Sequence, residues 1–159
     1  MQLPTAQPQP TSPVSVARPA RRRPDRAVVA WLRLARVFQK VNRATSEALR
    51  DVGLSLGQFD VLVQIGSAEG ATQQQVADAL LVTKSNVCQL LDRLERAGLV
   101  ERRQHGRSNL LFLTADGREL YDRVVPAHER QIAGLLSSLG PDDRSQLLGL
   151  LRKLDRALT

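Results

Sequence analysis

The run TQQQVADALLVTKSNVCQLLDRLERAG, residues 72–98, contains two helix starts separated by a short turn. Thr72 is followed three residues later by Gln75, which is the spacing of a capping box: each side chain satisfies a free backbone N–H group at a helix start. Thr83 repeats the N-cap, and residues 81–83 leave a turn of the length that a helix-turn-helix requires. The run therefore predicts a short helix, a tight turn and a second helix that ends before Gly98.

The second helix of this run has one apolar face and one polar face. Val87, Leu90, Leu91 and Leu94 recur at helical spacing and predict the face that packs on the core. Asn and Gln side chains can pair with adenine edges, Lys and Arg favour guanine or phosphate, and free N–H groups at a helix start bind anions. The residues at the start and on the outer face that we expect to contact DNA are Thr83, Lys84, Ser85, Asn86, Gln89 and Arg93.

A change of periodicity after Gly98 predicts a small hairpin. Residues 99–103 and 108–113 have the pattern of two short strands, and residues 104–107 form the turn between them. An arginine at the tip of such a hairpin suits a narrow minor groove, whose negative potential attracts it. The basic residues that we expect at DNA on this hairpin are Arg102, Arg103, His105 and Arg107.

Upstream, Ser55 and Gln58 form another capping box, so the element order is helix, helix, short helix, turn, helix and hairpin. This order predicts a winged helix-turn-helix over residues 54–114. Longer amphipathic helices flank it at 26–52 and 115–158, which predicts a mainly α fold with one small β-hairpin wing.

Residues 1–24 differ from the rest of the chain in composition. They hold six of the eight prolines, and we predict a disordered tail rather than an export or transit signal. Residues 1–26 contain five Arg and one Asp and so contribute +4 to the net charge of +7. The basic excess of the folded part, 25–159, is therefore small, and the prediction of DNA binding depends on where its charges lie.

Composition excludes several other classes. The 159 residues are 42% hydrophobic, as in one ordinary soluble domain, and no apolar run approaches the roughly 20 residues that span a membrane. One Cys and two His leave little for metal chemistry, so we expect no metal and no cofactor. The sequence lacks a Ser/His/Asp or Cys/His set and a Gly-rich phosphate loop, so we do not expect an enzyme.

Residues 56–117 resemble the MarR family of bacterial transcription regulators. The segments that carry the resemblance are QFDVL at 58–62, TQQQVA at 72–77, VTKSNV at 82–87, LLDRLERAGLVER at 90–102 and LTADG at 113–117. With the flanking helices, the resemblance covers residues 26–159. His105 stands where the family usually has an Asp before the basic residues of the wing, so the role of the wing-tip arginine is carried onto Arg107 alone.

The resemblance implies a homodimer in which the first helix and the last two helices of each protomer interlock. Pairing also explains why these helices carry more apolar surface than one small domain needs. The family has a ligand crevice between these helices and the winged lobe. Trp31, Phe38 and Phe59 either line that crevice or form part of the core, and the spacing favours the core.

We therefore expect a cytoplasmic, nucleoid-associated bacterial repressor that binds a pseudo-palindromic double-stranded DNA operator and responds to a small-molecule effector. A nucleoid-type protein that coats DNA without sequence preference is the main alternative, and an enzyme or a protein-binding module are weaker ones. Cys88 is interpreted as a small packed residue rather than an oxidant sensor, and His128 as a dimer or surface histidine.

Overall fold

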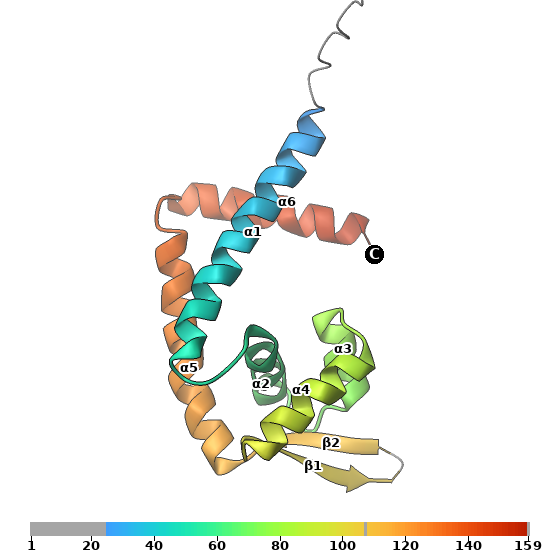
Figure 1. Ribbon diagram of the computed structural model, residues 1–159. Coiled ribbons are helices and arrows are strands. Elements are labelled where there is room, and N and C mark those ends of the chain that lie inside the picture. The colour runs from blue at the N-terminus through green and yellow to red at the C-terminus, as the bar shows by residue number, and fades with distance from the viewer. Residues whose placement is uncertain (1–24, 107, 159) are drawn as a thin grey trace, which may run out of the picture.

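The computed structural model describes residues 25–106 and 108–158 (Figure 1). These residues form six α-helices and one two-stranded antiparallel hairpin, which confirms the predicted fold class. The predicted tail 1–24 and Arg107 lie outside the described residues. In chain order the elements are α1 (Arg26–Arg50), α2 (Leu56–Ser67), α3 (Gln73–Leu80), α4 (Lys84–Arg96), β1 (Val100–His105), β2 (Ser108–Leu113), α5 (Ala115–Leu135) and α6 (Pro141–Ala157).

The helix starts follow the cap signals in the sequence. Ser55 and Thr72 each accept a hydrogen bond from the backbone N–H three residues on, and the side chains of Gln58 and Gln75 accept one from the cap N–H in return. Thr83 accepts a hydrogen bond from the N–H of Asn86, 3.2 Å away. These predicted caps are confirmed, and they set the starts of α2, α3 and α4.

The turn between α3 and α4 is tight because its first residue is left-handed. Leu81 has a φ of 54°, a conformation that costs free energy for any residue with a Cβ. The turn closes when the N–H of Val82 donates to the carbonyl of Ala77 at 3.0 Å. Leu81 therefore directs the chain from α3 into α4 within three residues.

The core lies where α2, α3, α4 and the hairpin meet. Burying each of its Leu, Ile or Val side chains stabilises the fold by about 1.5–3 kcal/mol. The largest side chains that are fully or almost fully buried are Val61, Leu62, Ile65, Val76, Val87, Leu91, Leu94, Val100 and Leu111. The apolar face of α4 that the sequence predicted is thus the face that holds this helix in the lobe.

The hairpin is longer than predicted and has a third partner. β1 continues to His105, two residues beyond the predicted end, and His105 pairs with Ser108. The N–H of Gly70 donates to the carbonyl of Leu111 at 2.8 Å, and Leu111 donates back to Ala71 at 2.9 Å. Residues 70–72 therefore add a short extended segment to the edge of β2. The capping signature at Thr72 predicts only a helix start for this segment.

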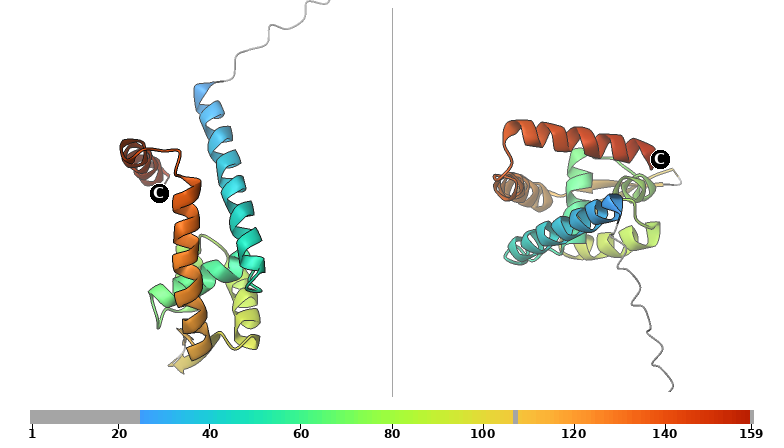
Figure 2. Two further views of the ribbon diagram at one scale, coloured as in Figure 1. Left: turned by 90° about the vertical axis from the view of Figure 1, so that its left-hand side faces the viewer. Right: turned by 90° about the horizontal axis from the view of Figure 1, so that it is seen from above.

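Helices α1 and α5 run side by side away from this lobe (Figure 2), and α6 crosses α1 in the view of Figure 1. The Gln131 side chain of α5 donates to the carbonyl of Ala44 of α1 at 2.9 Å. Beyond this point α1 exposes large apolar side chains, among them Trp31 at 64% and Phe38 at 62%. The leucines of α6 are exposed or half-buried, so one protomer leaves the apolar stripes of both helices largely uncovered.

Candidate nucleic-acid interface

The outer face of α4 is polar, exposed and free of core contacts. Val87, Leu91 and Leu94 are fully buried on the opposite face and hold the helix against the lobe. The first turn of α4, fully described, contains no acidic residue, so nothing there opposes the attraction of its positive dipole end for an anion. The predicted contact residues that are exposed on this element are Thr83, Lys84, Ser85, Asn86, Gln89 and Arg93.

Arg102 does not lie on this surface, although the sequence analysis expected it there. Its guanidinium is directed at α4, its side chain is only 17% exposed, and its Nη2 lies 2.6 Å from Oδ1 of Asp92. Its Nη1 contacts Oε2 of Glu95. Burial alone would lower the pKa of Arg102, but the hydrogen bond to Asp92 and the two carboxylate charges outweigh burial and raise it. Arg102 is thus a partly buried cation with its own counter-ions.

The other expected hairpin residues divide into two groups. Arg103 is 62% exposed on the face of β1 opposite Arg102, where it pairs with Glu101. Its guanidinium also lies over the ring of Phe112, 4.3 Å from the centroid, an arrangement typical of a cation–π contact. His105 is exposed at the end of β1, and Arg107 lies outside the described residues.

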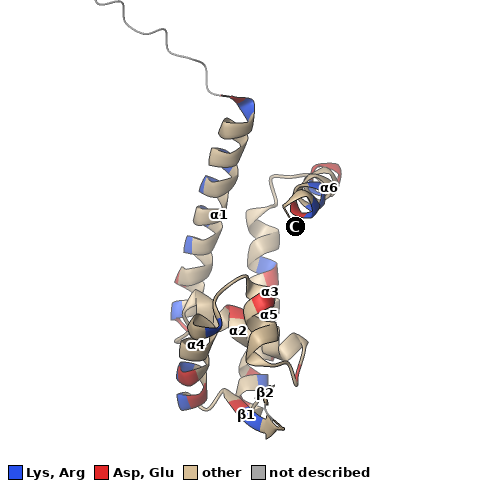
Figure 3. Ribbon diagram, turned by 90° about the vertical axis from the view of Figure 1, so that its right-hand side faces the viewer, with Lys and Arg blue, Asp and Glu red and all other residues tan. Residues whose placement is uncertain are grey.

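Acidic and basic positions alternate at the end of α4 and at the base of β1 (Figure 3). Asp92 and Glu95, which were not among the predicted site residues, are the partners of Arg102. Two signals in the sequence could have found them. Neighbours in a strand point to opposite faces, so Arg102 and Arg103 cannot share one surface, and residues three apart on a helix share a face.

The three aromatic residues proposed for a ligand crevice do not come together. Trp31 and Phe38 are exposed on α1, whereas Phe59 is buried in the core at 4% exposure. Trp31 contributes instead to a shallow hollow between α1 and α6, with Leu34, Leu151 and Leu154 among its other lining residues. Phe59 is therefore a core residue, whereas Trp31 and Phe38 lie on the exposed face of α1, so the three do not line one cavity within a protomer.

A more enclosed apolar cavity lies between the end of α1 and α5. Its volume is about 360 Å³, and Arg123, His128 and Gln131 supply polar groups among otherwise apolar lining residues. The remaining lining residues are Ala48, Leu49, Val52, Val124 and Ala127. Pockets that bind small molecules are typically lined in this way, with a few polar groups that orient the ligand.

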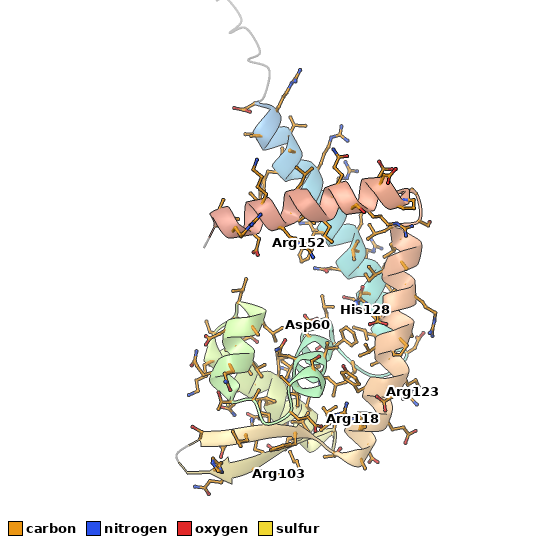
Figure 4. All side chains as sticks on the ribbon, turned by 180° about the vertical axis from the view of Figure 1, so that it is seen from behind. Asp60, Arg103, Arg118, Arg123, His128 and Arg152 are labelled. Atoms are coloured by element: carbon orange, nitrogen blue, oxygen red, sulfur yellow. The ribbon has the colours of Figure 1, made fainter. Side chains whose placement is uncertain are left out.

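His128, for which the sequence predicts a dimer or surface position, is half-buried and packs within the protomer. Its ring meets that of Phe59 edge to face, with centroids 4.8 Å apart, and its Nδ1 is buried without a hydrogen-bond partner among the described residues. Asp60 of α2 and His128 both line a second cavity of about 300 Å³, and Figure 4 shows the two residues on neighbouring elements. Burial raises the pKa of Asp60, while the charge of His128 acts in the opposite direction.

Three further findings hold for residues 25–106 and 108–158. Within these ranges, no helix is both long and apolar enough to cross a membrane. No group of three or more His, Cys, Asp or Glu side chains in the described part is arranged to hold a metal ion. Cys88 is a free thiol, half-buried on α4.

Comparison with known proteins gives a consistent result. The model of the MarR family matches residues 52–108. The HTH-type transcriptional regulator YkoM of Bacillus subtilis is 33% identical over 132 residues, which cover 81% of this chain and 86% of YkoM. HTH-type transcriptional regulators of Bacillus cereus are 34% identical over 96 residues, and the match spans 65% of their length.

Solved structures resemble the fold over most of its length. AbsC, a MarR family transcriptional regulator from Streptomyces coelicolor, superposes with a TM-score of 0.78 at 25% identity, covering 87% of this chain and 98% of AbsC. BpsR of Bordetella bronchiseptica superposes with a TM-score of 0.71 at 28% identity, covering 79% and 93% of the two chains. The DNA binding of BpsR is regulated by 6-hydroxynicotinic acid.

Proposed function

Because the chain belongs to the MarR family of helix-turn-helix transcriptional regulators, we propose that it binds an operator in double-stranded DNA and represses transcription in the bacterial cytoplasm. The outer face of α4 is the observation that carries this proposal. Lys84, Ser85, Asn86 and Gln89 are exposed on it, while the opposite face is buried. These residue types are those that read base edges in the major groove.

The same proposal includes a homodimer. The apolar stripes of α1 and α6 are exposed in one protomer, and Trp31 and Leu151 line one hollow between them. A second copy of the chain can cover such a stripe, because an isologous interface pairs identical patches of two protomers. Two copies of α4 would then read half-sites about 34–36 Å apart on a pseudo-palindrome.

We further propose that a small amphipathic molecule modulates DNA binding from the cavity between α1 and α5. The control of BpsR by 6-hydroxynicotinic acid supports this, as do the polar groups of Arg123, His128 and Gln131 in an apolar setting. Such an effector acts only if it binds the DNA-competent and DNA-incompetent forms with unequal affinity. This cavity replaces the aromatic trio as the candidate effector site.

A nucleoid-type protein that coats DNA is the second candidate. The distribution of positive charge along the sequence favours this candidate, because five of the arginines lie within residues 18–26. Charge of this kind supplies affinity without sequence preference, because it acts on phosphates alone. The two candidates differ in the ratio of specific to non-specific affinity.

Repeated selection of duplexes from a random-sequence library by the purified full chain tests the proposal. We expect enrichment of a two-fold symmetric sequence that binds on the order of 10³-fold more tightly than random duplex. Arg93→Ala should weaken binding of the selected duplex, whereas Arg43→Ala, on an exposed α1 side chain, should leave it unchanged. Equal affinity for selected and random duplexes would favour the coating protein instead.

A further inference from the structure

We propose that Arg102 is a positioning residue that clamps the hairpin to α4. The hairpin and α4 then contact DNA as one rigid unit. The clamp consists of Arg102 of β1 with Asp92 and Glu95 of α4. The inference rests on the proposed DNA-binding function and assigns Arg102 a role within it. It also replaces the expectation that Arg102 contacts DNA directly.

The pleat of β1 explains why Arg102 is directed at α4. Val100, two residues earlier on the same face, is 2% exposed and belongs to the core. The cross-strand partner of Arg102 is Leu111, which is fully buried and shares that face. The next residue of β1 on this face, Gln104, is already exposed. Arg102 is therefore the last residue of β1 that packs toward the core before the hairpin extends beyond it.

The contacts of Arg102 follow one face of α4. Its Nη2 donates to Asp92 at 2.6 Å and to the carbonyl of Cys88 at 3.4 Å, and its Nη1 donates to Glu95. Residues 88, 92 and 95 are spaced by four and three and so lie above one another along the helix. The planar guanidinium thus bridges two turns of α4, a geometry that a lysine cannot reproduce.

The charges of the clamp argue against a direct contact with DNA. Arg102 is matched by two carboxylates, so the three side chains together carry a net negative charge close to the surface proposed to meet DNA. Two acidic partners would weaken the attraction between an arginine and a DNA phosphate. Charge-assisted hydrogen bonds to a largely buried guanidinium do explain the arrangement, because they fix one relative placement of strand and helix.

The experiment measures binding by the full chain to the duplex that it selects from a random library, for Arg102→Gln, Asp92→Asn and the double variant. If the clamp exists, each single variant should bind the selected duplex on the order of tenfold more weakly than the parent does. The double variant should bind no more weakly than the single variant with the lower affinity. The slope of affinity against salt should stay unchanged. Arg43→Gln, which breaks an exposed ion pair on α1, is the matched control and should bind as the parent does.

A direct phosphate contact gives the opposite pattern, which would overturn the clamp. Arg102→Gln would then reduce the salt slope by about 0.9, the value for one phosphate that is no longer neutralised. Asp92→Asn would leave binding unchanged or strengthen it, because it removes a charge that repels DNA. The sign of the Asp92→Asn effect alone therefore separates the two roles.

Amide hydrogen exchange tests the clamp without DNA. In Arg102→Gln and in Asp92→Asn we expect faster exchange at residues 103–110, with α2 as slow as in the parent. Equal exchange rates at the hairpin in the parent and the variants would refute the clamp, whatever the affinities of these proteins for DNA. Failure of the parent chain to select any duplex would instead refute the proposed function, so the two failures are distinguishable.

Discussion

The backbone of Gly117 lies against the carbonyl group of Leu99, so close that a Cβ on Gly117 would be 1.8 Å from the carbonyl oxygen. Thr114 strengthens this junction, because its hydroxyl donates to the carbonyl of Gly98 at 2.5 Å and its N–H to Leu99 at 3.2 Å. The start of α5 is thereby joined to the segment between α4 and β1.

Gly117→Ala should therefore destabilise the protein by about 1–3 kcal/mol, the cost of overpacking a close contact. The clash is with backbone atoms, which cannot rotate away as a side chain can. Urea unfolding at fixed protein concentration measures the change. Gly134→Ala in the same helix meets nothing within 4 Å and should be neutral or stabilising; equal destabilisation of both variants would contradict the close contact.

Thr83→Ala removes the side-chain cap of α4 and should cost about 1 kcal/mol of the free energy of unfolding. The affinity for a selected duplex should also fall, because the first turn of α4 frays where the proposed contacts begin. Thr83→Ser keeps an acceptor oxygen and should retain most of both properties. Thermal unfolding and a binding titration of the two variants check this; a serine variant as weak as the alanine variant would argue for a role of the methyl group.

Asp60→Asn should be more stable than the parent at pH 7, with an advantage that shrinks as the pH falls. Burial raises the pKa of Asp60 in the folded protein above the unfolded value of 3.8. The folded chain therefore holds this proton more tightly, and the associated stability, present below pH 3.8, is lost as the pH rises through the folded pKa. His128 partly offsets the effect when it is charged.

Urea unfolding of the parent and Asp60→Asn from pH 7 down to pH 4 measures this difference. Asp122→Asn, at an exposed carboxylate of α5, controls for the general effect of removing one negative charge. An Asp60→Asn protein that is less stable than the parent at pH 7 would show that the ionised carboxylate has a favourable partner there.

Leu151→Lys should convert the proposed dimer to a monomer at micromolar concentration. Leu151 is half exposed on the stripe of α6 and lines the hollow that also contains Trp31, so a charge there would be buried by pairing. Sedimentation velocity measures the mass. Leu151→Met preserves the apolar contact and should remain dimeric; a parent chain that sediments as a monomer would refute the homodimer itself.

Deletion of residues 1–24 removes four arginines and should weaken binding to every duplex by a similar factor. The salt slope should fall by up to about 0.9 for each phosphate that the arginines no longer neutralise, while the preference for the selected sequence over random duplex stays the same. Titrations at several salt concentrations check both quantities. A loss of sequence preference on deletion would assign the tail a role in reading bases.

The winged helix-turn-helix was predictable because its signals are local. Caps such as Ser55 with Gln58 and Thr72 with Gln75 act over three residues, and the stripe Val87, Leu91 and Leu94 follows from helical periodicity alone. The addition of residues 70–72 to β2 was not predictable in this way, since it pairs segments about forty residues apart.

The sequence by itself thus determined which elements form, where they begin, and that the outer face of α4 is polar and basic. Strand alternation separates Arg102 from Arg103, but only the tertiary structure decided which of them faces α4, where Arg102 meets Asp92 and Glu95. It also placed the half-buried His128 against the ring of Phe59. The physical reason is common to both cases: the residue type gives a side chain its charge, but the packing of distant elements decides whether that charge meets solvent or a partner.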